Sequence, residues 1–175
     1  MAKTTDRIAL DDWYAIATAS ELTETMQTTR LLGQSIEYGF GPDGMPLVRE
    51  ILDDGARGQS LPVKVRYGCL FTTLGNPTKD IVHIAEAEED DRRFVLCGWV
   101  TMRASGLRVV ENFLDMAHFP FVHTDILGSE PHTEVPGYAS EIRRDVDEVW
   151  ATNCTFFQPR IAATEDKGDF VHLTY

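Results

Sequence analysis

The stretch ENFLDMAHFPFVH, residues 111–123, decides how the rest of the chain is interpreted. It holds two histidines, one aspartate and one asparagine among aromatic and aliphatic residues. Apolar residues recur here at the i, i+3, i+4, i+7 spacing of a helix, which predicts a helix from about Leu107 to Phe119. On that helix Asn112, Asp115 and His118 are each three residues apart, so they form one polar line.

The second histidine needs an irregularity in this helix to meet the first. His123 follows His118 by five residues, which is about 140° around the axis of an unbroken helix. Pro120 limits regular helix, because its ring clashes with the carbonyl four residues earlier and it has no N–H to donate. A break or widened turn near Pro120 would bring the imidazoles together, and helix irregularities of this kind are frequent at functional sites.

Two converging imidazoles with a nearby carboxylate suit a divalent transition metal. Two histidines and one carboxylate on one face, with the other positions open, are the ligand set of non-heme Fe(II) oxygenases. A pair of histidines on a mostly apolar helix is also found as hydrogen-bonded core residues. Spacing alone therefore leaves both interpretations open.

The pattern Asn-x2-Asp-x2-His-x4-His in this stretch resembles the mononuclear iron motif of Rieske non-heme iron oxygenases. Within that family it is most similar to the branch of homotrimeric aromatic-acid O-demethylases and ring hydroxylases. The resemblance covers most of residues 10–175. Its other segments are DWYAIA at 12–17, RLLG at 30–33, VRYG at 65–68, LGNP at 74–77, ILG at 126–128 and VPGY at 135–138.

The resemblance implies a role for each polar residue of the motif. His118 and His123 match the two histidine ligands of iron. Asp115 matches the acid that accepts a hydrogen bond from a ligand histidine and relays electrons from a cluster on the neighbouring subunit. Such carboxylates orient metal-bound imidazoles and raise their basicity. Asn112 matches an amide near the iron.

The chain departs from the family in its first domain, where a Cys-x-His pair and a Cys-x2-His pair hold a [2Fe–2S] cluster. The corresponding segment, residues 50–61, reads EILDDGARGQSL and has neither residue type. None of Cys69, Cys97 and Cys154 has a histidine two or three residues later. The sequence therefore predicts Fe(II) at the mononuclear site and no [2Fe–2S] cluster of the chain's own.

A second departure concerns the third iron ligand. In the family this ligand is an aspartate far downstream of the second histidine, and no residue up to Tyr175 matches it. Asp125 and Glu134 are acids close to the motif that would be substitute ligands, although their spacing does not require it. The resemblance thus implies a shortened member of the family with part of its catalytic domain.

Composition excludes several classes of partner. The net charge is −12 and the pI is about 4.7, which argues against nucleic acids and anionic membrane surfaces, since both attract Lys and Arg. No segment approaches the roughly 20 apolar residues of a membrane span. The first residues lead into no apolar signal-peptide core, and three cysteines without framework spacing suit a reducing compartment. A cytoplasmic protein is expected.

The distribution of strand and helix patterns predicts an α+β fold. Residues 1–75 are expected to form a small antiparallel sheet lobe, a Rieske-like scaffold without its cluster. Residues 76–175 are expected to form part of a helix-grip catalytic domain, an antiparallel sheet with helices on one side. Cys69 and Cys97 are expected to be buried in strands. The predicted strands are 31–40, 45–52, 61–74, 93–101 and two or three within 138–157 and 170–175, with a turn at 41–44 and a loop at 53–60.

Three functions stay open. The first is an oxidoreductase that incorporates oxygen into a small aromatic or apolar substrate by hydroxylation or demethylation. It would work in a homotrimer or hetero-oligomer, with electrons from a Rieske or ferredoxin-type donor and a reductase. The second is a degenerate, non-catalytic paralogue that serves as a subunit. The third is a small protein that binds apolar ligands in a helix-grip cavity without redox chemistry.

Overall fold

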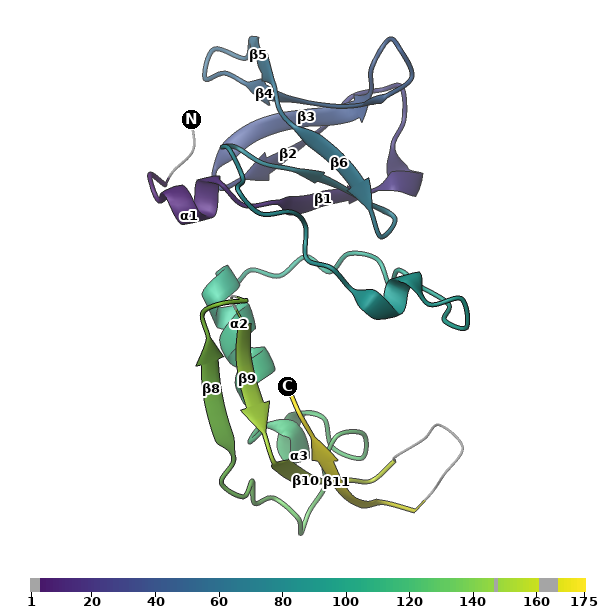
Figure 1. The fold of residues 1–175 in the computed structure, drawn as a ribbon, viewed down its shortest axis with the longest axis vertical. Helices are drawn as coiled ribbons and strands as arrows, with labels where there is room; N and C mark the ends of the chain where they lie inside the picture. The colour runs from purple at the N-terminus through teal and green to yellow at the C-terminus, as the bar shows by residue number, and fades with distance from the viewer. Residues whose placement is uncertain (1–3, 147, 161–166) are drawn as a thin grey trace. The chain divides into compact units, whose positions relative to one another are not determined.

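The computed structural model describes residues 4–146, 148–160 and 167–175. The chain divides into two compact units, Met1–Val100 and Thr101–Tyr175. Both consist mainly of antiparallel strands with a few short helices (Figure 1), so the predicted α+β class is confirmed. The expected domain boundary after residue 75 stays a prediction. Within the described ranges, no helix is long and apolar enough to span a membrane.

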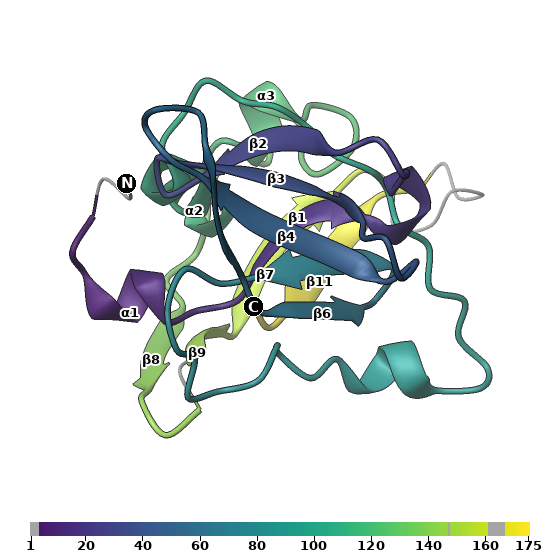
Figure 2. The ribbon, with the colours of Figure 1, turned by 90° about the horizontal axis from the view of Figure 1, so that it is seen from above.

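The first unit contains two antiparallel sheets. The three-stranded sheet has the order β1-β7-β6, and the four-stranded sheet has the order β2-β3-β4-β5 (Figures 1 and 2). The strands are β1 (Tyr14–Thr18), β2 (Gln27–Leu31), β3 (Gln34–Phe40), β4 (Pro46–Ile51), β5 (Arg57–Ser60), β6 (Val63–Arg66) and β7 (Cys69–Thr72). Short helical turns are α1 (Arg7–Leu10), η1 (Ala19–Glu21) and η2 (Ala85–Glu88).

One cluster of buried aliphatic side chains holds the two sheets of the first unit together. Ile36 and Val48 come from the four-stranded sheet and Leu70 from the three-stranded sheet, and all three are fully buried. Antiparallel sheets that each bury one face in this way form a sandwich-like core. The first unit is therefore a complete small β fold around its own core.

Two tight turns divide segments that the sequence pattern predicts as single strands. Leu32 and Gly33 have φ of 49° and 87° and join β2 to β3, and Tyr67 and Gly68 have φ of 52° and 69° and join β6 to β7. Two consecutive residues of positive φ make the turn that best fits the twist of a hairpin. The predicted single strands 31–40 and 61–74 are wrong in this respect. The predicted hairpin of residues 45–52 is confirmed as β4, which pairs with β3.

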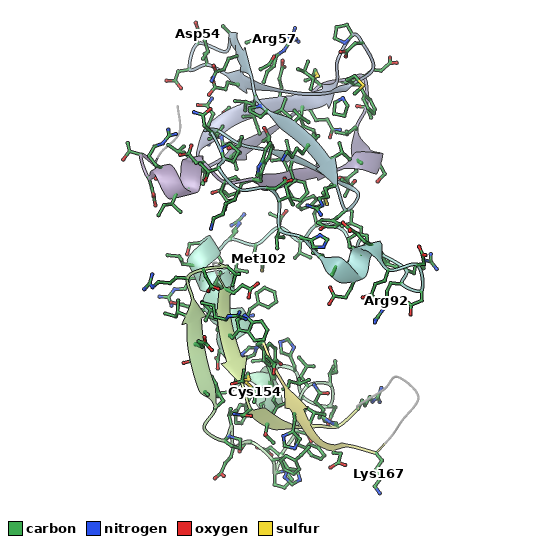
Figure 3. The ribbon with its side chains drawn as sticks, viewed as in Figure 1. Asp54, Arg57, Arg92, Met102, Cys154 and Lys167 are labelled. Atoms are coloured by element: carbon green, nitrogen blue, oxygen red, sulfur yellow. The ribbon has the colours of Figure 1, made fainter. Side chains whose placement is uncertain are left out.

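The connection between β4 and β5 is a short turn that its own backbone hydrogen bonds hold together. The Leu52 N–H donates to the Ala56 carbonyl at 2.9 Å, and the Gly55 N–H donates to the Leu52 carbonyl at 2.9 Å. Asp54 and Arg57 lie at this end of the first unit (Figure 3). The prediction of a loop over 53–60 is wrong for its second half, which forms β5 and adds an edge strand to the sheet.

The predicted strand over residues 93–101 is absent. These residues have no regular secondary structure, and Val95 and Val100 are 62% and 82% exposed. β-forming side chains do not make a strand without a neighbouring strand to bond, and no strand in the described part of the chain pairs with this segment. Cys97 is consequently exposed, so its predicted burial is wrong, whereas Cys69 is buried as predicted.

The three thiols should react with iodoacetamide in two classes. We expect Cys97 to be alkylated in the folded protein, because it is exposed. Cys69 should stay protected, because it is buried and its burial raises the pKa of its thiol, which lowers the thiolate fraction. Cys154 is fully buried and should also stay protected. Peptide mass spectrometry with and without urea checks this; rapid labelling of Cys69 without urea would contradict the core described above.

The described part of the second unit contains two short helices and two antiparallel strand pairs. β9 runs into β10 at Asn153, which has φ of 60° (Figure 1). The Tyr175 N–H and carbonyl both bond to Ala151, at 2.9 and 2.8 Å, so the chain after β11 continues the pairing beside β9. The expected strands of 138–157 and 170–175 are thus confirmed. The elements are α2 (Gly106–Leu114), α3 (Phe119–Val122), β8 (Ala139–Arg143), β9 (Glu148–Thr152), β10 (Cys154–Gln158) and β11 (Asp169–Leu173).

The core of the second unit is small and lies between α3 and β10. The Phe119 and Phe156 rings meet edge to face with centroids 5.4 Å apart. Met116 and Cys154 complete the buried cluster. Among the residues that the structure describes, this core has only four buried members, so each of them contributes a large share of its packing energy.

Candidate metal centre

The helix that carries the motif ends earlier than its apolar pattern predicts. α2 ends at Leu114, and Asp115 is its C-cap residue, with its N–H bonded to the Glu111 carbonyl at 3.0 Å. The Asp115 side chain accepts a hydrogen bond from the Ala117 N–H at 2.9 Å. An aspartate that bonds the backbone two residues ahead favours a turn over continued helix. The predicted helix to Phe119 is therefore wrong over its last turn.

The break thus lies before Pro120 and not at it. Pro120 is in the first turn of α3, where its missing N–H would have no helical partner and its fixed φ suits the helix. The Thr124 hydroxyl donates to the Pro120 carbonyl at 2.6 Å at the other end of this turn. A Cβ at Gly128 would lie 2.8 Å from Pro120 N, so only glycine permits this close approach of the following loop.

The single turn of α3 holds one histidine at each end. The His118 carbonyl accepts from the N–H groups of Phe121 and Val122 at 3.0 and 2.8 Å. The His123 N–H donates to the Phe119 carbonyl at 3.0 Å. The two imidazole centroids are 5.2 Å apart, with planes at 60°. The predicted convergence of the imidazoles is confirmed, through a break at a different place.

A carboxylate faces the more buried imidazole. The His118 side chain is 14% exposed, and its Nδ1 lies 3.4 Å from Asp115 Oδ2. This contact is too poorly aligned for a hydrogen bond, which leaves Nδ1 as a buried polar atom without a hydrogen-bond partner. A small approach of the carboxylate would complete the bond and fix the tautomer, leaving Nε2 with its lone pair free for a metal.

An aromatic ring separates the imidazoles from the core. The Phe119 centroid is 5.0 Å from that of His118 and 6.1 Å from that of His123. Because Phe119 also packs on Phe156, it ties the orientation of both histidines to the sheet. The sequence analysis did not predict that Phe119 orients the two histidines. Its position between two candidate ligands, as an aromatic residue, was the signal that could have indicated this.

The other predicted site residues do not join this pair. Asn112 is exposed on α2 and makes no hydrogen bond to either histidine in the described part of the chain. The predicted polar line through Asn112, Asp115 and His118 is wrong, because the helix ends before Asp115. Across residues 4–146, 148–160 and 167–175, no three His, Cys, Asp or Glu side chains are close enough to hold a metal, so neither Asp125 nor Glu134 completes a ligand set here.

The donor chemistry nevertheless fits Fe(II) in part. Two adjacent imidazoles, one facing a carboxylate, supply two ligands that suit this ion and the outer contact that ligand histidines usually have. The same unit has an apolar cavity of about 150 Å³. The cavity lies between α2 and the sheet, and it is lined by Phe113, Leu114, Met116, Tyr138, Ser140, Val149, Trp150, Ala151 and Tyr175.

Two matches support the assignment of the chain to the Rieske oxygenase family. Residues 102–159 match the vanillate O-demethylase oxygenase C-terminal domain, a range that includes Asp115, His118 and His123. Over 167 residues the chain is 46% identical to the probable methylxanthine N7-demethylase NdmC of Pseudomonas sp. (strain TJI-51). That alignment covers 95% of this chain and 57% of the relative, so the chain spans little more than half the length of this curated relative.

Proposed function

We propose that the chain is the oxygenase component of an N- or O-demethylating enzyme, with Fe(II) held by His118 and His123. The observation that carries the proposal is the convergence of these imidazoles, 5.2 Å apart, beside Asp115. It is supported by the family match over 102–159 and by the relative, whose name is that of a methylxanthine demethylase. The substrate class is a small, flat, mostly apolar molecule with a methyl group on nitrogen or oxygen.

Each named residue has one task in this proposal. His118 and His123 would hold the iron through ring-nitrogen lone pairs, and bound iron would supply the activation of O2. Asp115 Oδ2 lies 3.4 Å from His118 Nδ1, and a small approach of the carboxylate would let it accept a hydrogen bond that orients the ring and raises the basicity of the other ring nitrogen. The aromatic and aliphatic walls of the cavity between α2 and the sheet hold a flat ring and exclude water.

The reaction also defines the partner. Removal of an N-methyl group with O2, two electrons and two protons gives an N–H group, formaldehyde and water. Residues 50–61 contain no Cys or His to hold a cluster. The electrons therefore come from a Rieske or ferredoxin-type donor and a reductase on partner chains, in a homotrimer or hetero-oligomer.

The test is a reconstitution with the full chain. Protein loaded with Fe(II) without oxygen is mixed with a methylxanthine, a ferredoxin-type donor, its reductase, NADH and O2. We expect formaldehyde in proportion to the O2 consumed, and none from His123→Ala protein. No formaldehyde and no O2 uptake above the donor-only control, from protein with bound iron, would overturn the proposal.

A second function has one observation in its favour. The apolar cavity of about 150 Å³ suits a non-catalytic protein that binds small apolar ligands. Equal affinity for a methylxanthine in iron-loaded and iron-stripped protein, together with no turnover, would favour this function. A paralogue that serves only as a subunit would bind neither ligand nor iron.

Asp115→Asn should weaken Fe(II) binding while leaving the fold intact. We expect a loss of about 10–100-fold in affinity, which is typical for a carboxylate that orients a metal-bound histidine. Equilibrium dialysis without oxygen measures it. Glu111→Gln is the matched control, because this carboxylate lies in the last turn of α2, next to Asp115, but pairs with Arg108. Equal losses in the two variants would show that Asp115 acts only through general charge.

A further inference from the structure

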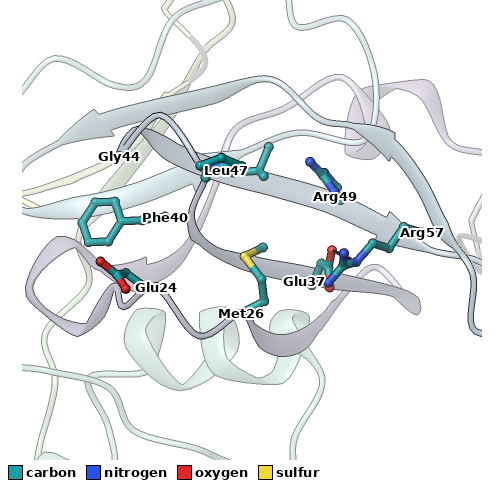
Figure 4. A pocket seen from close by; sticks show the side chains of 10 residues that line it. Glu24, Met26, Glu37, Phe40, Gly44, Leu47, Arg49 and Arg57 are labelled. Atoms are coloured by element: carbon teal, nitrogen blue, oxygen red, sulfur yellow. Dashed lines mark ion pairs between the residues drawn. The ribbon is translucent and has the colours of Figure 1, made fainter.

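The first unit has a pocket that the proposed iron chemistry does not use. It has a volume of about 630 Å³ and lies on the face of the four-stranded sheet (Figure 4). Its apolar side chains are those of Met26, Phe40, Pro42 and Leu47, and its charged ones are those of Glu24, Glu37, Arg49 and Arg57. Figure 4 shows Glu37, Arg49 and Arg57 together at one end, with Met26 beside them and Phe40 at the other end. The pocket therefore has a polar end and an apolar body.

The strand register explains the arrangement. Glu37 on β3 lies opposite Arg49 on β4, and Gly39 lies opposite Leu47. Directly opposed residues of an antiparallel pair share a face, as do residues two apart on one strand. A Cβ at Gly39 would lie 2.8 Å from the Thr23 carbonyl oxygen and 3.0 Å from Met26 Sδ. The missing side chain at Gly39 thus lets Met26 lie close to the sheet.

Glu37 has a buried carboxylate oxygen without a hydrogen bond at the polar end of this pocket. The residue is 8% exposed, although it is charged. Arg57 Nε lies 3.0 Å from Glu37 Oε1 and pairs with it electrostatically. The N–H is not aligned with the oxygen, however, so Oε1 is buried without a hydrogen bond. Buried acceptors are nearly always hydrogen-bonded, which makes this atom a point of recognition for a donor.

Arg49 presents unused donors at the same end. Its guanidinium makes no hydrogen bond or ion pair with any residue that the structure describes. The guanidinium carries five N–H donors in a rigid plane. An acceptor atom next to a donor atom on one ligand would therefore engage Arg49 and Glu37 together.

The charged side chains that line the pocket favour a neutral ligand over a charged one. Two carboxylates, Glu24 and Glu37, balance two guanidiniums, Arg49 and Arg57. A cation drawn to Glu37 meets the two arginines, and an anion drawn to the arginines meets Glu37. A neutral group with an N–H beside a carbonyl has neither penalty. Its N–H donates to Glu37 Oε1 and its carbonyl oxygen accepts from Arg49.

We propose that this pocket binds a neutral, flat lactam, a ring in which N–H and C=O are adjacent. The lactam edge lies between Glu37 and Arg49, and the ring lies against Met26 and Leu47. Thioether and aliphatic side chains suit the face of such a ring. The site is independent of the iron site of the second unit, so it stands whether or not the proposed demethylation does.

The test uses 2-pyridone, the smallest aromatic lactam, and N-methyl-2-pyridone, which has the same ring and carbonyl but no N–H. Each is titrated into the full chain, and backbone amide shifts are followed by NMR. We expect saturable shifts at Gly39, Leu47 and Arg49 with a Kd of about 1 mM, ordinary for so small a ligand. N-methyl-2-pyridone should bind at least about tenfold more weakly, since it leaves Glu37 without its donor.

Two variants and one control decide the assignment. Glu37→Ala and Arg49→Ala should each weaken 2-pyridone binding at least about tenfold. Arg49 has no partner within the described ranges, so its loss tests the site even if Glu37→Ala does not fold. Glu50→Ala is the control, because Glu50 is on the opposite face of β4 from Arg49 and does not line the pocket.

Several results would overturn the proposal. These are equal binding of the two pyridones, tighter binding of benzamidinium or benzoate than of 2-pyridone, and full binding by Arg49→Ala. Shifts confined to Phe113 and Trp150 would mean that the ligand enters the cavity of the second unit instead. All of these measurements use iron-free protein, so failure of the demethylase proposal leaves them unaffected.

Discussion

His118→Ala protein should bind Fe(II) at least about 100-fold more weakly than the unaltered chain. The loss of Fe(II) affinity should be larger than in Asp115→Asn protein, because the substitution removes one of the two imidazole donors at the ends of α3. His123→Ala should have the same effect, since the two rings are neighbours with centroids 5.2 Å apart. Equilibrium dialysis without oxygen, followed by metal analysis, measures both affinities.

His132→Ala is the matched control for this pair. His132 belongs to the same unit, but its ring packs on Phe157, with centroids 4.5 Å apart. Its removal should leave Fe(II) affinity unchanged within a factor of about 2, as for a residue that shares no contact with the site. Iron binding that survives in His118→Ala and His123→Ala alike would place the metal elsewhere and remove the basis of the oxygenase proposal.

Phe119→Ala should destabilise the second unit by about 3–4 kcal/mol. This ring is 9% exposed and packs on Phe156 in a core that has four buried residues within the described ranges. Truncation of a buried phenylalanine typically costs about 3–5 kcal/mol. The Cys154 thiol is fully buried in the same core. Its alkylation as a function of urea concentration therefore reports the opening of this unit separately from the first.

Phe121→Ala is the control for Phe119→Ala, with the same chemical change two residues later. Phe121 is 63% exposed, so its loss should change the stability by no more than about 0.5 kcal/mol. Fe(II) binding should also weaken in Phe119→Ala protein, because the ring contacts both imidazoles. Equal urea profiles for the two variants would show that the core of α3 and β10 does not hold this unit together.

The sequence pattern predicts the hairpins that have a conventional turn and misses those that do not. The turn at Gly41-Pro42-Asp43-Gly44 is rich in turn-forming residues, and β3 and β4 pair around it as predicted. Leu32 and Tyr67 adopt positive φ although neither residue type favours it, so the single glycines that follow them, Gly33 and Gly68, are the signals of these turns in the sequence. The strand predicted at 93–101 is wrong for a different reason. Its residues favour strands, but no strand in the described part of the chain pairs with them.

The sequence predicted that the His118 and His123 rings meet, but not the backbone that brings them together. The spacing of His118 and His123 indicated a break between them, and the rings do meet. Pro120 was the evident cause by residue type, yet it fits the first turn of α3. The break comes from Asp115, whose side chain competes for the backbone of Ala117. Such local competition depends on geometry that residue spacing does not contain.

The hydrogen-bonded turn between β4 and β5 is a position at which the first unit should tolerate inserted residues. The hydrogen bonds of this turn join only Leu52, Gly55 and Ala56 to one another. The residues that pair β4 with β5 are not part of the turn. Lengthening an exposed loop costs only about 0.6 kcal/mol per doubling of its length. A reporter peptide placed between Asp54 and Gly55 would leave the sheet and Arg57 in register. The number of residues between β4 and β5 can therefore change without changing the fold.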